Sequence, residues 1–195
     1  MTPLRMQLQR LREYSDLAQI GEIVRRYFAM NAFDGILTII GVLMGSLMGG
    51  VREAKIVVVT GLSTSLAMGI SGLWGSYLTE SAERRHEIEE LQSYTLTDLS
   101  QSKIGKASRL AAVLVSVVDG LSPFLASVLV LLPFLFAGLF PAVSWAYYTS
   151  FAVALVTLFG LGIFLGCVSK ENLVVSGLKT LVAGLVCIVL SYFLE

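Results

Sequence analysis

Charged residues are scarce in this chain. Asp, Glu, Lys and Arg make up 14% of its 195 residues, whereas about a quarter is usual for soluble domains. Hydrophobic residues make up 55%, and the mean hydropathy is +0.78. The charges sum to zero, so nothing in the balance indicates a nucleic-acid partner. The composition excludes an ordinary soluble domain and predicts a membrane protein.

Residues with reactive side chains are also few. The chain has two cysteines and one histidine, and it has no CxxC, no phosphate-binding loop and no nucleophile elbow. Cys167 and Cys187 lie in separate apolar runs, where ordinary packing explains them better than a disulfide framework. We therefore expect neither an enzyme nor a tightly bound cofactor.

Long apolar runs dominate what is present. A helix needs about 20 residues to cross a hydrocarbon core of about 30 Å, and five runs meet that length, near residues 29–50, 55–78, 108–139, 142–168 and 173–194. None shows the strict alternation of a membrane-facing strand, which argues against a barrel. The sequence predicts an all-α integral membrane protein with five transmembrane helices, in contact with the lipid bilayer.

The predicted organisation has four parts. Residues 1–28 form an N-terminal amphipathic surface helix, 29–78 transmembrane helices 1 and 2, 79–107 a short acidic cytoplasmic insert, and 108–195 transmembrane helices 3 to 5. The first half of the insert, TESAERRHEIEELQSY, has strong helix formers and should continue the second helix. The second half, TLTDLSQSKIGKAS, has the Ser, Thr, Asp and Gly typical of a turn or a short connection. The third run is long enough for a kink or a break at residues 120–123.

The positive charges predict the orientation. With the N-terminus inside, eleven Lys and Arg residues fall in inner segments and only Arg52 and Lys55 in outer ones. Inner segments of membrane proteins carry the excess of Lys and Arg, so this distribution predicts N-in and C-out.

Two acidic residues interrupt the apolar runs. Asp34 and Asp119 are each followed by glycine, and both helices run from inside to outside. An aspartate at membrane depth costs on the order of 2.5 to 3.5 kcal/mol on insertion scales, so something must compensate it. We interpret both as ligands for a cation or a proton; the alternative is a structural pin bonded to Ser, Thr or backbone.

Polar and small residues accompany each aspartate. On the first helix Asp34, Thr38, Gly41 and Gly45 share one face, and the glycines also fit plain helix packing. On the third, Pro123 lacks the N–H that would bond the Asp119 carbonyl, with Ser116 and Ser122 nearby. Such an oxygen cluster suits a divalent cation, although a purely flexible kink is the rival explanation.

The second helix and the insert add further candidates. Gly72 and Ser76 belong to a small-residue stripe that would line a tight interface or a narrow path, with Met68 beside it as a soft ligand or as packing. Beyond them the carboxylates of Glu80, Glu83, Glu87 and Glu90 share one helical face, with His86 next to it. That face either collects metal ions or is a solvated surface in which Glu80 pairs with Arg84.

Four segments, DGILTIIGVLMG, GSYLTESAERR, LLPFLF and SGLKTLVAGLVCIVLSYFLE, together resemble the vacuolar iron transporter family. The resemblance implies five transmembrane helices, a homodimer with the metal path between subunits, and export of Fe(II) or Mn(II) from the cytosol in exchange for protons. It implies that Asp34 is the aspartate on that path. Ser76 stands where the family has glutamate, Gly72 where it has the path methionine, and the long metal-binding insert of eukaryotic members is reduced to the glutamate stripe.

The favoured hypothesis is therefore a divalent-metal transporter of a divergent, prokaryotic type, located in the cell membrane, with Asp34 and Asp119 at the site. The alternative is a non-transporting membrane module whose aspartates pin helices and whose acidic stripe docks a partner.

Overall fold

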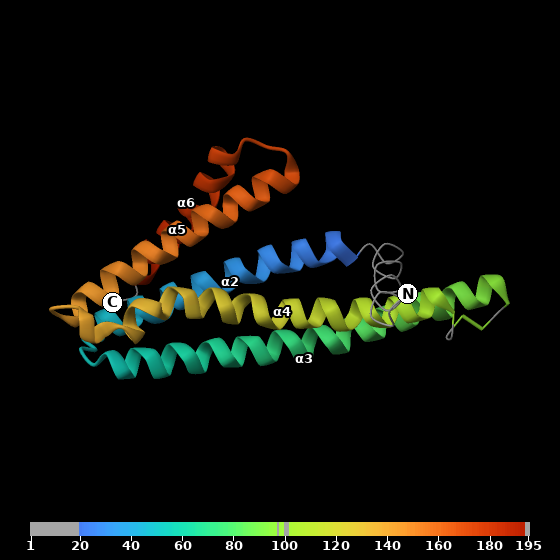
Figure 1. Ribbon diagram of the computed structural model, residues 1–195, viewed down its shortest axis with the longest axis horizontal. Helices are drawn as coiled ribbons and strands as arrows, with labels where there is room; N and C mark the ends of the chain where they lie inside the picture. Colours follow the sequence, from blue (N-terminus) through green and yellow to red (C-terminus); the bar gives the residue numbers. More distant parts are fainter. Residues whose placement is uncertain (1–19, 97, 100–101, 194–195) are drawn as a thin grey trace, which may run out of the picture. The chain divides into compact units, whose positions relative to one another are not determined.

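The computed structural model describes residues 20–96, 98–99 and 102–193. Its elements are α2 (Ile20–Met48), α3 (Ala54–Thr95), α4 (Lys103–Leu135), the 3₁₀ helix η1 (Ala137–Leu139), α5 (Val143–Ser169) and α6 (Leu173–Tyr192), shown in Figure 1. All regular structure in these residues is helical, which confirms the all-α prediction. Of the predicted surface helix, residues 1–19 lie outside the described part, and residues 20–28 belong to α2.

Five helices of the described chain are long and apolar enough to cross a membrane, as the sequence predicted. They are Gly21–Met48, Ala54–Thr95, Lys103–Leu139, Val143–Ser169 and Leu173–Tyr192. Each covers nearly all of the apolar run assigned to it, because an uninterrupted run leaves the backbone no partner in lipid except its own helical hydrogen bonds.

The helix α3 is longer than a bilayer is thick. Its 42 residues correspond to roughly 63 Å at 1.5 Å per residue, about twice the hydrocarbon core. The first half of the polar insert therefore continues the second spanning helix, as expected. The second half was predicted too long, because α4 already begins at Lys103 rather than near residue 108.

Helix α4 is continuous across its two prolines. Pro123 and Pro133 both lie inside Lys103–Leu135, so there is no break at residues 120–123. A proline removes one intrahelical hydrogen bond without ending a membrane helix when neighbouring helices support it. η1 follows directly after α4 and leads into α5.

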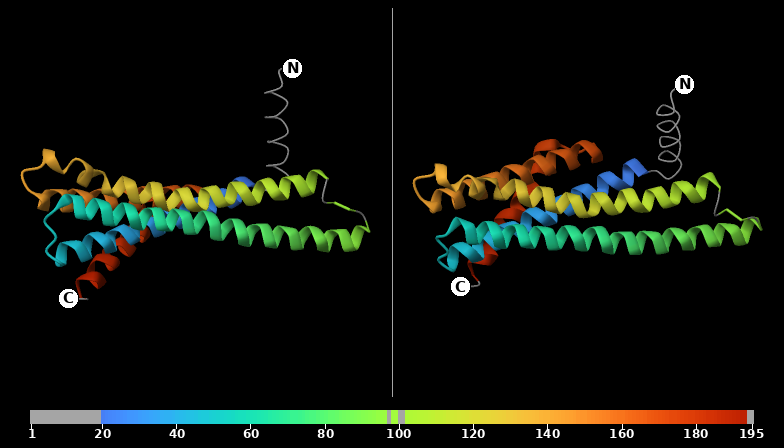
Figure 2. Two further views of the ribbon diagram at one scale, coloured as in Figure 1. Left: turned by 90° about the horizontal axis from the view of Figure 1, so that it is seen from below. Right: turned by 60° about the horizontal axis from the view of Figure 1, so that its bottom comes forward.

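The described helices divide into two compact units. One contains the start of α2 up to Phe28 together with Ile70–Leu121; the other contains Ala29–Gly69 and the chain from Ser122. Within the first unit, the end of α3 and the start of α4 lie side by side and antiparallel (Figure 2). This arrangement makes residues 70–95 and 103–121 the two arms of a helical hairpin.

The second unit has the apolar core. Ile36, Ile39, Ile40 and Leu43 of α2 are fully buried, and they pack in one cluster with Val57, Val130, Leu131, Phe134, Ala146, Tyr147, Ala154 and Leu158. Phe134 and Tyr147 meet edge to face, with ring centroids 4.8 Å apart. The Tyr147 hydroxyl donates to the Val51 carbonyl at 2.9 Å, which ties the α2–α3 connection to α5.

Small residues bring α5 and α6 together, and Figure 1 shows the two helices side by side. A Cβ added to Gly162 would lie 2.5 Å from the Ser176 carbonyl oxygen and 2.6 Å from the Gly177 Cα. The Thr180 hydroxyl donates to the Leu158 carbonyl at 2.7 Å. Close backbone approach and interhelical hydrogen bonds replace the hydrophobic drive that lipid does not supply.

Candidate functional site

Asp34 lies in the middle of the first spanning helix with its side chain exposed. Its neighbours Ala32, Gly35 and Ile36 are buried. Within the described residues the Asp34 carboxylate has no hydrogen-bond or ion-pair partner. Among the described residues, the side chain is therefore not pinned to a hydroxyl or to another helix.

The face of α2 that contains Asp34 is uncovered. Met30 is 58% exposed, Thr38 is half-buried, and Gly45 is exposed. A Cβ added to Gly41 or to Gly45 would meet no described atom within 4 Å outside its own helix. Gly41 and Gly45 on this face thus do not pack against another described helix.

The glycine of the first Asp-Gly pair has a different role from its aspartate. A Cβ at Gly35 would lie 2.5 Å from the Pro123 carbonyl oxygen and 2.6 Å from its Cα, so α2 and α4 cross at this point with their backbones in contact. The Ser127 hydroxyl of α4 donates to the Gly35 carbonyl at 3.0 Å. Pro123 therefore lies at a tight helix crossing, against the residue that follows Asp34 in the chain.

The second Asp-Gly pair also marks a helix crossing. A Cβ at Gly72 of α3 would lie 2.9 Å from the Asp119 carbonyl oxygen and 3.2 Å from the Gly120 Cα. The Asp119 side chain is half-buried, and Ser116, one turn earlier, is buried with its hydroxyl donating to the Ala112 carbonyl. Gly72 thus serves as a contact point between α3 and α4, the tight-interface alternative from the sequence.

The residues of the predicted oxygen cluster around Asp119 all belong to helix α4. Ser116 and Asp119 are in the first compact unit, whereas Ser122, Pro123 and also Asp34 of α2 are in the second. Ser122 is buried. Met68 is half-buried at the end of the second unit's part of α3. Joint metal binding by Asp34 and Asp119 stays a prediction.

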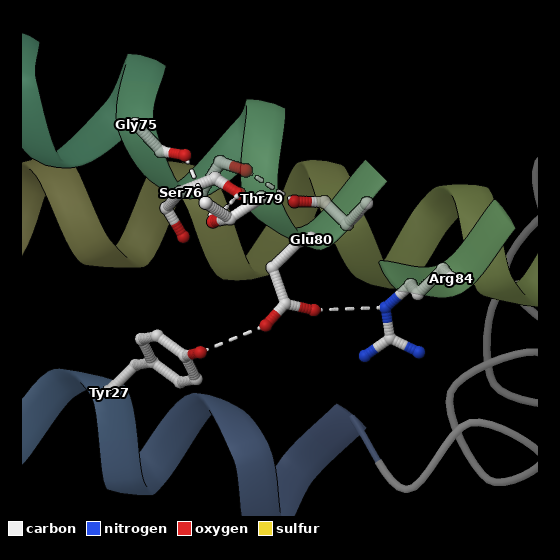
Figure 3. A network of polar contacts seen from close by, with 8 residues as sticks. Tyr27, Gly75, Ser76, Thr79, Glu80 and Arg84 are labelled. Carbon is white, nitrogen blue, oxygen red and sulfur yellow. Dashed lines mark hydrogen bonds and ion pairs between the residues drawn. The ribbon is translucent and has the colours of Figure 1, made fainter. Parts of the chain in front are cut away.

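Glu80 is the acidic residue of α3 with the most defined contacts. Its Oε1 accepts a hydrogen bond from the Tyr27 hydroxyl of α2 at 2.9 Å, and its Oε2 contacts the Arg84 Nε at 3.1 Å, as Figure 3 shows. The side chains of Glu80 and Arg84 are only 17% and 14% exposed. The i,i+4 pair expected as the alternative to metal binding is therefore present, and both Glu80 oxygens have donors.

Ser76 lies one turn before Glu80 on the same side of α3 (Figure 3). It is 7% exposed, and its hydroxyl oxygen has no hydrogen-bond partner in the described chain. A buried hydroxyl without a partner is uncommon in folded proteins and calls for an explanation.

The rest of the acidic stripe differs from Glu80. Glu83, Glu87 and Glu90 are exposed, and so is His86 beside them. The spacing predicted a common face for all four glutamates, but the tertiary contact with Tyr27 separates Glu80 from the other three. Within the described residues no group of three or more His, Cys, Asp or Glu side chains is arranged to hold a metal ion.

Sequence reasoning missed Tyr27 as a partner of Glu80. The two residues are 53 positions apart, and their hydrogen bond joins two helices. Tyr27 also lies within electrostatic range of Asp119 and has the Arg26 guanidinium 5.6 Å from its ring centroid. The only local signal was a tyrosine among arginines just before an apolar run.

Five helices of spanning length within the described residues, with one aspartate exposed inside a span and another beside a helix crossing, define a multi-pass membrane protein. A family model described as the VIT family matches residues 26–117. An uncharacterised protein of Methanocaldococcus jannaschii is 30% identical over 178 residues, which cover 90% of each chain. The chain belongs to the VIT family, whose members are membrane transporters of metal ions rather than enzymes.

Proposed function

We propose that this protein exports a divalent transition metal, Fe(II) or Mn(II), from the cytosol in exchange for protons. It works as a homodimer in a prokaryotic cell membrane, with the N-in and C-out orientation that the positive charges favour. Membership of the VIT family and the archaeal relative support the general class. Asp34 and Asp119 bind the metal.

The main support for this proposal is the environment of the Asp34 carboxylate. A carboxylate that only pinned helices together would bond a hydroxyl, a backbone group or a cation of its own chain. Asp34 has no such partner in the described residues, although it lies within a spanning helix and is exposed. An uncompensated charge there costs on the order of 2.5 to 3.5 kcal/mol, which a visiting cation or proton offsets.

Exchange follows from the chemistry of a carboxylate. The same oxygens accept either a proton or a divalent metal ion, so the two compete for one site. Metal that arrives from the metal-rich side displaces a proton, and a proton that arrives from the acidic side displaces the metal. Exposed Glu83, Glu87 and Glu90 raise the local concentration of cations near the inner end of α3.

The uncovered face of α2 supports a homodimer. Gly41 and Gly45 offer the close backbone approach that drives helix association in lipid, but no helix of the described chain uses it. A second copy on this face covers the glycines and removes Asp34 from lipid. Twofold symmetry then places the two Asp34 residues on one path between the subunits.

Transport into vesicles tests the proposed function. Purified protein in liposomes with a pH gradient should move Fe(II) or Mn(II) and release protons in the opposite direction, with Co(II) and Zn(II) as comparisons. A metal-sensitive dye and a pH dye trapped inside report both fluxes. Absence of flux for all four metals in vesicles of confirmed protein content would contradict the proposal.

Substituting Gly41 should separate the subunits. Gly41→Leu places a large side chain where the backbones of two copies meet, so we expect the dimer population to fall about tenfold or more at equal protein-to-detergent ratio. Crosslinking in membranes and light scattering on purified protein measure this change.

Gly160→Leu is the matched control for Gly41→Leu. Gly160 is also exposed on a spanning helix, and a Cβ there meets no described atom within 4 Å. If both variants stay dimeric, or both lose the dimer equally, the Asp34 face is not the subunit interface.

A further inference from the structure

The buried ion pair at the inner end of α3 has features that a surface pair lacks. Glu80 and Arg84 are mostly buried, whereas neighbouring Glu83 and Glu87 are exposed. Removing two charges from water costs more than an i,i+4 contact usually returns. Helix stability alone therefore gives little reason to bury this pair, and a role for Glu80 as a binding group explains it better.

The contact geometry makes Arg84 displaceable. Arg84 meets Glu80 through one guanidinium nitrogen, Nε, at 3.1 Å. The strongest arginine–carboxylate pairs instead use two parallel hydrogen bonds. The other Glu80 oxygen is fixed by the Tyr27 hydroxyl at 2.9 Å, so the carboxylate keeps its orientation if Arg84 moves away.

A second oxygen ligand lies one turn along the helix. The Ser76 hydroxyl is more than nine-tenths buried, has no partner in the described residues, and projects from the same side of α3 as Glu80 (Figure 3). Gly72, a further turn away, packs against the Asp119 backbone. Glu80, Ser76 and Gly72 therefore lie one turn apart on one face of α3, in order from the acidic stripe toward Asp119.

We propose that Arg84 is a tethered competitor cation on Glu80, which the transported divalent metal must displace in order to bind between Glu80 and the Ser76 hydroxyl. This inference rests on the proposed function for the identity of the metal. A doubly charged ion gains about twice the Coulomb energy of a guanidinium at the same distance. Divalent ions can therefore displace Arg84 from Glu80, whereas monovalent ions cannot.

Binding of Mn(II) to full-length protein tests this proposal. The background is the Asp34→Asn, Asp119→Asn double variant, so that binding reports Glu80 without the transport site. Adding Arg84→Gln should raise the Mn(II) affinity about tenfold, because the charge left on Glu80 has lost its resident counter-ion. Potassium at a fixed excess should weaken Mn(II) binding by a larger factor in Arg84→Gln than in the background protein. Titration calorimetry and the electron paramagnetic resonance signal of free Mn(II) measure both effects.

Matched variants identify the site. Glu80→Gln should abolish the gain that Arg84→Gln produces, and Ser76→Ala should reduce it several-fold, whereas Glu89→Gln, at an exposed position on the same helix, should leave it unchanged. Arg84→Lys keeps the charge on a shorter side chain and should give a smaller gain in Mn(II) affinity. This variant provides a second test if Arg84→Gln folds poorly.

Two outcomes would overturn the proposal: an unchanged Mn(II) affinity in both folded Arg84 variants, or a gain that persists when Glu80 is also neutralised. Neither depends on transport. If vesicles containing the wild-type protein move no metal but Arg84→Gln still binds Mn(II) more tightly, the export function fails and the Glu80 site stands.

Discussion

Replacing Asp34 by asparagine should lower metal transport by at least about a hundredfold, because removing one partner of a desolvated charge pair costs roughly 3 to 5 kcal/mol and each 1.36 kcal/mol is a factor of ten. The asparagine side chain keeps the size and one acceptor oxygen of the aspartate but has no negative charge for the metal and no site for the exchanged proton. The initial rate of Mn(II) flux into vesicles, at equal protein content, measures the loss.

Thermal stability distinguishes this result from a structural defect. Asp34 has no partner to lose among the described residues, so Asp34→Asn should leave the apparent melting temperature of the purified protein unchanged or higher. Glu53→Gln, at an exposed position between α2 and α3, is the control and should transport normally. Normal flux in Asp34→Asn, combined with a dimer that melts early, would favour the non-transporting module.

Gly35→Ala should destabilise the fold strongly, and Gly35→Val more so. The added Cβ would lie 2.5 Å from the Pro123 carbonyl oxygen, and a backbone atom inside a helix cannot move aside as the end of a side chain can. Overpacking of this kind costs about 1 to 3 kcal/mol. Separating the helices would also break the 3.0 Å hydrogen bond from Ser127 to the Gly35 carbonyl, worth about 1 kcal/mol.

Heating in detergent followed by size-exclusion chromatography measures the Gly35 effect as a lower apparent melting temperature. Gly160→Ala is the matched control, because a Cβ there meets no described atom within 4 Å and alanine favours the helix. If Gly35→Ala melted at the temperature of Gly160→Ala, the close crossing of α2 and α4 at this residue would be wrong.

The helices and their number were predictable from the sequence. Uninterrupted apolar runs of spanning length allow no other backbone structure in lipid, so five runs gave five helices. The continuation of α3 to Thr95 was predictable for a similar reason, since TESAERRHEIEELQSY consists of helix formers without Gly or Pro. The start of α4 was not, because Ser, Gly and Lys in KIGKAS are as common in turns as in a first helical turn.

Two stripes that look alike in the sequence have different environments. Gly61 and Gly72 of α3 pack against Leu131 and the Asp119 backbone, whereas Gly41 and Gly45 of α2 meet no described atom. Both stripes have small residues at helical spacing. Which stripe packs inside the chain depends on helix rotation and crossing, and the local sequence does not determine either.

In the candidate site too, some features follow from the local sequence and others from the packing of helices. The sequence by itself determined the five spans, the two Asp-Gly pairs within them and the glutamate spacing of the insert, because each follows from local hydropathy or helical period. Only the tertiary structure decided that Gly35 and Gly72 lie at helix crossings, that Asp34 is exposed, and that Tyr27 and Arg84 hold Glu80 apart from the exposed glutamates. Those facts depend on contacts between residues far apart in the chain, and such contacts form only when whole helices pack.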